Sequence, residues 1–376
     1  MLASRSTALA IGASAMLALP TAFATERLQV VASFSILADM AMNVGGEHVE
    51  VTALVGPDSD THVFSPSPRD ARALAEADLV VFNGLRFEGW MERLLDSSDY
   101  AGPLVTASDG IDTLAYHGHE HDHAHGYDNV HRHDHDHDHD HDHDHDHDHD
   151  HDHDHDHDHD HDHDHDEQDN DDHGHGEASA HYGHDHGDDD PHGWQDLAMG
   201  KVYVANIRDG LIEADPDNEA DYRENAERYI NELEATDAEL RELIGEIPAS
   251  TSVITGHDSF GYFASAYGLR FLSPVGLSSE AEPSAADMAR LIDVIREQNV
   301  KALFHENMTS PAVINQLAEE TDLPIAGTLY ADALASEGEA STYLGMMRHN
   351  AQVLHGALAE PDRQDHGDDH DHDHSH

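Results

Sequence analysis

The chain has 376 residues and contains no cysteine. Disulfide bonds, thiolate metal ligands and a thiol for lipid attachment are therefore excluded by the composition. Lysine is nearly absent as well, occurring only at Lys201 and Lys301, and the formal net charge is −61. Such a chain is repelled by nucleic acid and by anionic membrane surfaces, so we expect neither as a partner.

Long apolar runs are missing from the sequence except near its beginning. Residues 1–24 combine a basic residue at Arg5, an apolar run from Ala8 to Leu19 and small residues at Ala22 and Ala24. This is the pattern of a cleaved secretory signal peptide. No later stretch approaches the roughly 20 apolar residues of a membrane-spanning helix. The sequence thus predicts a protein exported to the periplasm and not lipidated.

Histidine and aspartate, in contrast, are concentrated in two segments. His-Asp pairs repeat without interruption from His133 to Asp166, and a shorter segment of the same kind closes the chain. Imidazole and carboxylate groups both bind divalent metals, which favours a role in metal capture. The alternative is a low-complexity repeat that has expanded without a role. Neither segment can bury apolar surface, so we expect residues 117–190 and 361–376 to be disordered.

The remaining chain alternates short apolar runs with amphipathic patterns, which is typical of α/β proteins with helices covering parallel sheets. From Asp217 to Ile247 one long amphipathic pattern runs without an interior proline, and this predicts a single long helix between two α/β halves. The predicted organisation is a signal peptide at 1–24, an N-terminal lobe at 25–213 that includes the loop 117–190, a linking helix at 214–247, a C-terminal lobe at 248–360 and a tail at 361–376.

Few histidines lie outside the biased segments, and three of these occur in predicted loops. His62 lies in GPDSDTHVFSPSPRD, His192 in DDPHGWQDL and His257 in ITGHDSFGYF. Loops at strand ends are where α/β sheets bind ligands. Each histidine taken alone is compatible with an ordinary surface or capping role, whereas the three together could share one metal ion.

The strings around these histidines resemble those of the metal-specific substrate-binding proteins of ABC importers for zinc and manganese. The similarity extends over about residues 27–358, and its motifs are SFSILADMAMNVGGEHVEV, VGPDSDTHVFSPSPRD, DPHGWQDL, TGHDSFGYFASAYGL and GTLYADAL. It implies two α/β lobes joined by one long rigid helix. It also implies a buried metal site made by His62 and His192 from the N-terminal half and by His257 and Asp332 from the C-terminal half.

The same resemblance implies partners. We expect a monomer that works with an ABC permease and an ATPase in the inner membrane, and a periplasmic zinc chaperone is a further candidate partner. Some zinc-binding members carry an acidic residue directly before the first histidine, but Thr61 occupies that position here. Asp332 is therefore the expected fourth ligand.

The choice of metal follows from the donor atoms. Three imidazoles and one carboxylate suit tetrahedral zinc, whereas manganese favours more oxygen ligands. In the resembling family, manganese-binding members typically carry glutamate where His257 stands. The sequence therefore predicts a zinc-binding importer component in which the His-rich loop assists capture of the metal. A manganese-specific component and a periplasmic zinc buffer are the alternatives.

An enzyme is not predicted. The string from His305 to Thr309 begins the zinc-hydrolase pattern H-E-x-x-H and departs from it at the last position. No nucleophile elbow of the form G-x-S-x-G and no Walker-type phosphate loop occurs. Metal-bound imidazoles usually hydrogen-bond to an acceptor through their second nitrogen. Four acidic residues are nearby in sequence or motif, and the sequence does not select among them: Asp60, Asp190, Asp258 and Glu306.

Overall fold

The computed structural model describes residues 27–116, 189–249, 251–298 and 300–359. The predicted signal peptide, nearly all of the predicted His-rich loop and the predicted tail at 361–376 lie outside these residues. Within the described part of the chain, no helix combines the length and the apolar character needed to cross a membrane.

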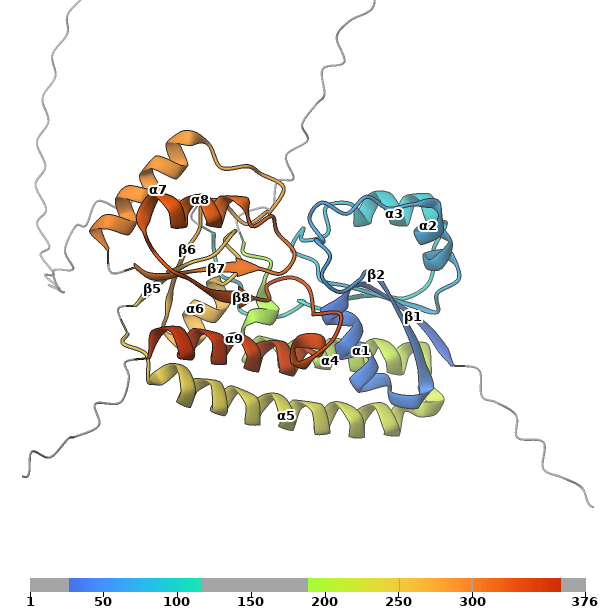
Figure 1. The fold of residues 1–376 in the computed structure, drawn as a ribbon. Coiled ribbons are helices and arrows are strands. Elements are labelled where there is room, and N and C mark those ends of the chain that lie inside the picture. Colours follow the sequence, from blue (N-terminus) through green and yellow to red (C-terminus); the bar gives the residue numbers. More distant parts are fainter. Residues whose placement is uncertain (1–26, 117–188, 250, 299, 360–376) are drawn as a thin grey trace, which may run out of the picture. The chain divides into compact units, whose positions relative to one another are not determined.

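Two four-stranded parallel sheets form the centres of the two halves, which confirms the predicted α/β fold (Figure 1). The first sheet has the order β2-β1-β3-β4 and the second has the order β6-β5-β7-β8. The strands are β1 (Leu28–Phe34), β2 (Val49–Val55), β3 (Leu79–Phe82), β4 (Leu104–Thr106), β5 (Ser252–Ile254), β6 (Arg270–Leu272), β7 (Val300–Glu306) and β8 (Ile325–Leu329).

Helices cover both faces of each sheet. In Figure 1, α2 and α3 lie on one face of the first sheet, with α1 and α4 on the other, while α7 and α8 lie opposite α6 and α9 about the second. The helices are α1 (Ser35–Gly45), α2 (Pro68–Ala75), α3 (Met91–Ser98), α4 (Leu197–Ala214), α6 (Gly261–Tyr267), α7 (Ala285–Glu297), α8 (Ala312–Thr321) and α9 (Tyr343–Leu358), with short 3-10 turns at η1 (Gly46–His48), η2 (Gly193–Gln195), η3 (Pro216–Asn218) and η4 (Glu339–Ser341).

The start of α2 shows how the sequence fixes a loop that carries a predicted metal ligand. The Ser67 hydroxyl accepts a hydrogen bond from the Arg69 N–H, and the Asp70 carboxylate accepts one from the Ser67 N–H at 2.7 Å. With Pro68 in the first turn, this is a capping box that defines the helix start. The loop between β2 and α2, which contains His62, therefore has a fixed end.

A single helix of 27 residues, α5 (Glu219–Gly245), follows the η3 turn. Its buried side chains recur every three or four residues, among them Tyr222, Tyr229 and Leu240. This stripe packs against α1 and α4 of the first half and against α6 and α9 of the second. The long helix predicted from the amphipathic pattern is thus present, its first two predicted residues belonging to the 3-10 turn.

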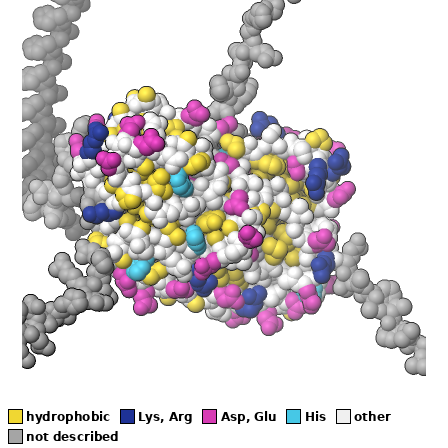
Figure 2. All heavy atoms as spheres, viewed as in Figure 1, with side chains coloured by type: hydrophobic (Ala, Val, Ile, Leu, Met, Phe, Trp, Pro, Cys, Tyr) yellow, Lys and Arg dark blue, Asp and Glu magenta, His cyan; other side chains and the backbone are white. Residues whose placement is uncertain are grey.

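The outer face of α5 is charged and internally paired. Arg223 with Glu219, Arg228 with Glu232, and Arg241 with Asp237 form ion pairs four residues apart. Figure 2 shows acidic and basic side chains together along the edge where α5 runs. Exposed pairs of this kind support an isolated helix by only a few tenths of a kcal/mol, about 0.2–0.5 each. Packing of the apolar stripe is therefore the main reason for the helix.

The described structure resumes at Asp189, earlier than composition suggested. Asp189 forms an antiparallel bridge with Ala115, and the Asp190 N–H donates to the Leu114 carbonyl at 2.8 Å. The sequence prediction had included both aspartates in the disordered loop, and for these two residues it was wrong. Composition could not separate them from the tract, because the tract is built of the same acidic residue.

Candidate metal centre

The four predicted ligands converge at the edge where strands of the two sheets end. His62 follows β2, His257 follows β5, Asp332 follows β8, and His192 directly precedes η2. One potential ligand atom from each of the four lies within 4.8 Å of those from the others. Among the described residues, these four make up the group of His, Asp and Glu side chains that could hold a metal ion.

The donor atoms are spaced as ligands of one small cation would be. Asp332 Oδ2 lies 3.2 Å from His62 Nε2 and 3.0 Å from His257 Nε2, and Asp332 Oδ1 lies 3.6 Å from His192 Nε2. A tetrahedral centre with bonds of about 2.0–2.1 Å separates neighbouring donors by about 3.3–3.4 Å. The measured separations scatter around that value.

Several of these donor atoms lack a hydrogen-bond partner among the described residues. Within the described structure, Nε2 of His192, Nε2 of His257 and both oxygens of Asp332 have no hydrogen-bond partner. Leaving a buried polar atom without a partner costs about 1–3 kcal/mol, and more for a charged one. A shared cation would satisfy all of them.

The outward nitrogens of two imidazoles are held by carboxylates. His192 Nδ1 is hydrogen-bonded to Asp190 Oδ1 at 2.7 Å, and His257 Nδ1 to Glu306 Oε2 at 2.6 Å. Each bond turns the Nε2 atom of its ring toward the centre, as is usual for metal-bound histidines. Of the four acidic neighbours noted in the sequence, Asp190 and Glu306 therefore orient rings.

The other two acidic neighbours have different contacts. Asp60 Oδ1 accepts the backbone N–H of His62 at 2.9 Å, which fixes the loop of that ligand. The backbone N–H of Asp258 donates to the Gly276 carbonyl at 3.0 Å. Neither pairing was accessible from the sequence, since it depends on how the loops turn.

Electrostatics at the centre favour a cation. Burial lowers the pKa of His62, which favours the neutral ring that a metal needs. Burial would also lower the pKa of His257, but the charges of Glu306 and Asp332 outweigh it and hold that pKa well above its usual range. Burial would raise the pKa of Asp332, but the charges of His257 and His192 hold it well below. The carboxylates thus create a site that attracts positive charge.

Aromatic rings enclose the centre on the side of the first half. The Phe87 ring lies edge-on to His62 and His192, with centroids 4.8 and 5.7 Å apart, and Trp194 lies 5.3 Å from His192. Phe34 packs on both Phe87 and Trp194. This wall excludes water and strengthens electrostatic interactions inside it. Sequence reasoning missed these residues.

Both tryptophans of the chain bond to the backbone beside a ligand. Trp90 donates its indole N–H to the Thr61 carbonyl at 2.9 Å, directly before His62. Trp194 and Gln195 both donate to the Ala331 carbonyl, which directly precedes Asp332. The adjacency of Trp194 and Gln195 to His192 in DPHGWQDL was the available sequence signal.

The remaining described histidines lie elsewhere. His48 pairs with Asp221, His355 pairs with Glu246, and His349 Nε2 lies 3.2 Å from the Thr328 carbonyl. His305 is the penultimate residue of β7, which confirms its interpretation as a strand-end residue. None of the four joins the centre.

Comparison with known proteins identifies the family. The sequence model described as zinc-uptake complex component A, periplasmic (ZnuA), matches residues 30–357. The chain belongs to this family. It is accordingly a periplasmic metal-binding component of an ABC metal importer and not an enzyme, and members of the family work with permease and ATPase components.

Individual relatives differ in the metal that their names state. The manganese-binding lipoprotein MntA of Bacillus subtilis is 29% identical over 342 residues, covering 89% of this chain and 91% of the relative. The iron-binding protein YfeA of Yersinia pestis is 26% identical over 334 residues, covering 88% and 86%. The structure of periplasmic zinc binding protein TroA from Treponema pallidum superposes with a TM-score of 0.67 at 22% identity, covering 89% and 100%, and so shares the fold.

Proposed function

We propose that this chain delivers zinc to an ABC importer and binds the ion through His62, His192, His257 and Asp332. The observation that carries the proposal is the convergence of three imidazole Nε2 atoms on one buried carboxylate at tetrahedral spacing. A donor set of three nitrogens and one carboxylate suits zinc. The ZnuA family description supports the same metal.

Manganese is the second candidate, because one feature of the centre favours it. Asp332 directs Oδ2 toward His62 and His257 and Oδ1 toward His192, so both oxygens are available to one ion. Bidentate binding would give a five-coordinate set with two oxygens, which is closer to the preference of manganese. Names of several relatives also state manganese.

Competition between the two metals tests the assignment. The full chain is loaded with zinc, challenged with a large excess of manganese, dialysed and analysed for both metals. We expect zinc to remain at one tight equivalent per chain. Zinc displaced by manganese would overturn the zinc assignment in favour of the alternative. The same analysis of His257→Ala should find the tight equivalent missing, with His48→Ala as the control histidine outside the centre.

The His/Asp-rich tract, which comprises residues 117–188, is proposed to assist the capture of zinc. It is joined to the fold at Tyr116 and Asp189, and Asp189 lies only three residues before His192. The Tyr116 hydroxyl lies so close to Gly276 that a Cβ atom built on this glycine would be 3.0 Å from the hydroxyl oxygen. Ligands tethered this close raise the local metal concentration at the centre. The plain zinc-buffer alternative does not need the four converging ligands.

The remaining expectations from the sequence are proposals of the same kind. They are a signal peptide at 1–24, lobes at 25–213 and 248–360 linked by 214–247, export without lipidation, and a monomer that meets a permease, an ATPase and a zinc chaperone. The lack of cysteine supports export without a lipid anchor. Mass analysis of the protein purified from the periplasm tests both the cleavage site and the lipid.

A further inference from the structure

The proposed centre is enclosed, and this raises the question of how metal reaches it. The side chains of His62, His192 and Asp332 have no exposed surface, and that of His257 has 1%. An ion can therefore exchange only where the enclosing residues leave space or move. The inference below rests on the proposed metal-binding function and concerns the route and the rate of exchange.

Two sides of the centre are closed by packing and hydrogen bonds. Phe87 and Trp194 cover the rings of His62 and His192, as described above. Beyond Asp332, the backbone N–H of Asp58 donates to the Leu334 carbonyl at 2.9 Å. The Asp58 carboxylate also accepts the Ser336 N–H at 3.0 Å and the Asn307 amide at 3.1 Å. These bonds tie the β2–α2 loop to the segment that follows Asp332 and to the residue that follows β7.

On a third side, a cavity adjoins one of the four ligand residues. Its volume is about 480 Å³, and His257 forms part of its wall. The Nε2 atom of His257 is buried and, within the described structure, has no hydrogen-bond partner. Val63, a residue that is 54% exposed and directly follows His62, also lines the cavity. The cavity thus extends from the protein surface to two ligand-bearing segments.

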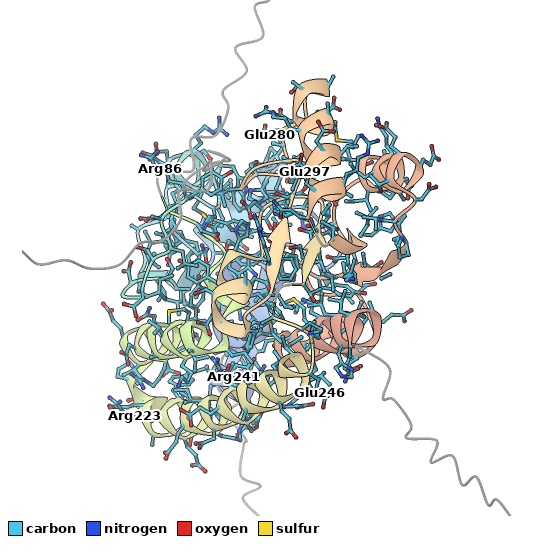
Figure 3. The ribbon with its side chains drawn as sticks, turned by 90° about the vertical axis from the view of Figure 1, so that its left-hand side faces the viewer. Arg86, Arg223, Arg241, Glu246, Glu280 and Glu297 are labelled. Carbon is cyan, nitrogen blue, oxygen red and sulfur yellow. The ribbon has the colours of Figure 1, made fainter. Side chains whose placement is uncertain are left out.

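Oxygen-bearing side chains line the way from the surface inward. Glu280 and Glu282 are exposed at the rim, while Ser279 and Thr309 are half-buried in the wall. Figure 3 places Glu280 on the side of the molecule opposite Arg223 and Arg241 of α5. Acidic groups at the mouth of a cleft attract cations and raise their rate of entry. Hydroxyl oxygens can then offer weak, exchangeable contacts to a divalent ion.

One carboxylate connects the rim of the cavity to the loop of a ligand. Asp60 Oδ1 accepts the His62 N–H at 2.9 Å, and Asp60 Oδ2 accepts the Ser279 hydroxyl at 2.6 Å. His62 belongs to the first half and Ser279, in the wall of the cavity, to the second, so this bond joins the two halves beside the cavity. Breaking it would free the rim segment from the ligand loop.

We propose that this cavity is the route by which the metal ion enters and leaves the centre, that Glu280 and Glu282 draw cations to its mouth, and that the Ser279–Asp60 hydrogen bond keeps the passage from the cavity to the buried ligands closed. These residues position and admit the ion without being its final ligands. They control the rates of exchange, whereas the four buried ligands set the affinity.

The experiment measures both rate constants for zinc with the full chain. Association is followed by stopped-flow tryptophan fluorescence, which reports on the centre because Trp194 lies against His192. Dissociation is followed by transfer of zinc to a chromogenic chelator. The variants are Ser279→Ala and the double variant Glu280→Gln/Glu282→Gln. The control is Glu224→Gln/Glu227→Gln, which removes the same charge from exposed positions on α5.

For the rim variant, we expect the association rate constant to fall about threefold to tenfold and to depend less on ionic strength. The α5 control should stay within about twofold of the unmodified chain, since its charges are distant from the cavity. An association rate equal to that of the control would overturn the route.

For Ser279→Ala, loss of a hydrogen bond to a charged acceptor should raise both rate constants, each by about threefold or more. Two unchanged rate constants would overturn the closure. If the unmodified chain takes up no zinc at the centre, the proposed function fails instead, and that result is distinguishable because no rate constant can then be measured.

Discussion

Trp194 donates its indole N–H to the backbone carbonyl oxygen of Ala331 across 2.9 Å, although 137 positions separate the two residues in the chain. Trp194 follows His192 by two residues, and Ala331 directly precedes Asp332. This bond therefore couples two ligand-bearing segments that come from opposite halves of the fold. It explains how a buried carboxylate from one half is held opposite an imidazole from the other.

Removing this bond should loosen the centre. Trp194→Phe keeps an aromatic ring but deletes the donor, leaving Gln195 as the remaining partner of Ala331. We expect zinc affinity to fall roughly fivefold, in line with the loss of a bond worth about 1 kcal/mol. The measurement is competition with a zinc chelator. Tyr100→Phe, which deletes a 2.7 Å bond to the Pro103 carbonyl away from the centre, should bind like the unmodified chain. Equal affinities of the two variants would contradict this role of Trp194.

The carboxylate behind His257 should matter almost as much as a ligand. Glu306→Gln keeps the shape of the side chain but removes the charge that orients the ring at 2.6 Å. Loss of such a partner typically weakens metal binding by about 10–100-fold. Isothermal titration with zinc tests this, with Glu319→Gln on α8 as an exposed control. Titration curves that coincide would show that Glu306 does not support the site.

Removing the His/Asp-rich tract should leave the tight site intact. Residues 117–188 are replaced by a short glycine-serine turn, so that the Ala115–Asp189 bridge and the Asp190–His192 hydrogen bond remain. We expect one tight zinc equivalent to persist and most of the weaker equivalents to disappear, leaving those of the C-terminal His/Asp segment, as counted by equilibrium dialysis. Loss of all tight binding would favour the zinc-buffer alternative over the four-ligand centre.

Capture by the tract should depend on pH. Imidazole must be neutral to bind metal, and its ordinary pKa is about 6.5. The weak zinc equivalents of the full chain should therefore be present at about pH 7.5 and largely lost at about pH 5.5. Dialysis at the two values measures the difference. Retention of these equivalents at the lower pH would mean that carboxylates rather than imidazoles bind them.

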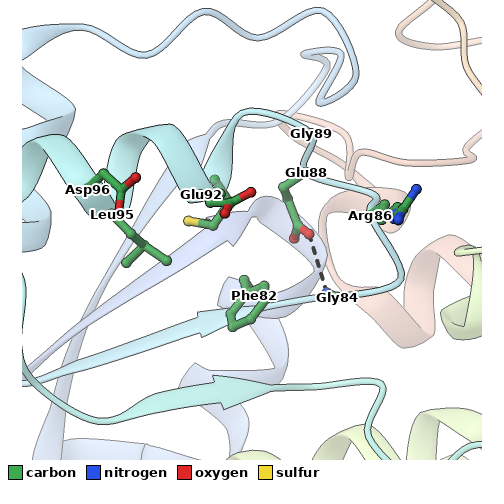
Figure 4. A pocket seen from close by; sticks show the side chains of 9 residues that line it. Phe82, Gly84, Arg86, Glu88, Gly89, Glu92, Leu95 and Asp96 are labelled. Atoms are coloured by element: carbon green, nitrogen blue, oxygen red, sulfur yellow. Dashed lines mark hydrogen bonds between the residues drawn. The ribbon is translucent and has the colours of Figure 1, made fainter. Parts of the chain in front are cut away.

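A buried carboxylate outside the centre should make stability depend on pH. Burial raises the pKa of Glu88 from 4.5 to about 7, although its oxygens accept bonds from Ser33, Asn83 and Gly84. Figure 4 shows the bond to Gly84 at the edge of a cavity of about 530 Å³. The folded state binds this proton more tightly than the unfolded state does. Its stabilising contribution is therefore complete below about pH 4.5 and is lost as the pH rises through 7.

Glu88→Gln should flatten that dependence. A pKa difference of this size corresponds to about 3 kcal/mol between the two ends of the range. Urea unfolding between about pH 5 and pH 8 gives the slope for each protein. Glu92→Gln, an exposed acid of the same cavity, is the matched control. Parallel slopes for Glu88→Gln and the unmodified chain would show that Glu88 is not protonated preferentially in the folded state.

Several features of this molecule follow from its sequence for clear physical reasons. The apolar stripe of α5 has helical spacing, and the capping residues before α2 mark its start, so both elements are readable locally. The four ligands were proposed from the resemblance of whole motifs, because residues as distant as His62 and Asp332 carry no local sign that they meet. Their convergence is a property of two sheets and not of any one segment.

The sequence named Asp190 and Glu306 among four acidic candidates but could not select them as the residues that orient the rings. Glu306 lies beside His257 because β7 is the neighbour of β5 in the order β6-β5-β7-β8, and strand order is set by packing of the whole half. Composition alone did not distinguish Asp190 from the neighbouring acidic residues of the tract. The Trp194 bond depends on a contact between the two halves, which local patterns do not encode.

The bridge between Ala115 and Asp189 has a consequence for how such a protein can vary. The bridge holds the residues on either side of the insertion next to each other. The length of the insertion therefore does not change the geometry of the folded domain at this point. The entropic cost of a longer loop grows only logarithmically with its length. His-Asp units can accordingly be gained or lost during evolution. Such changes alter the number of metal-binding side chains in the insertion and leave the four buried ligands unchanged.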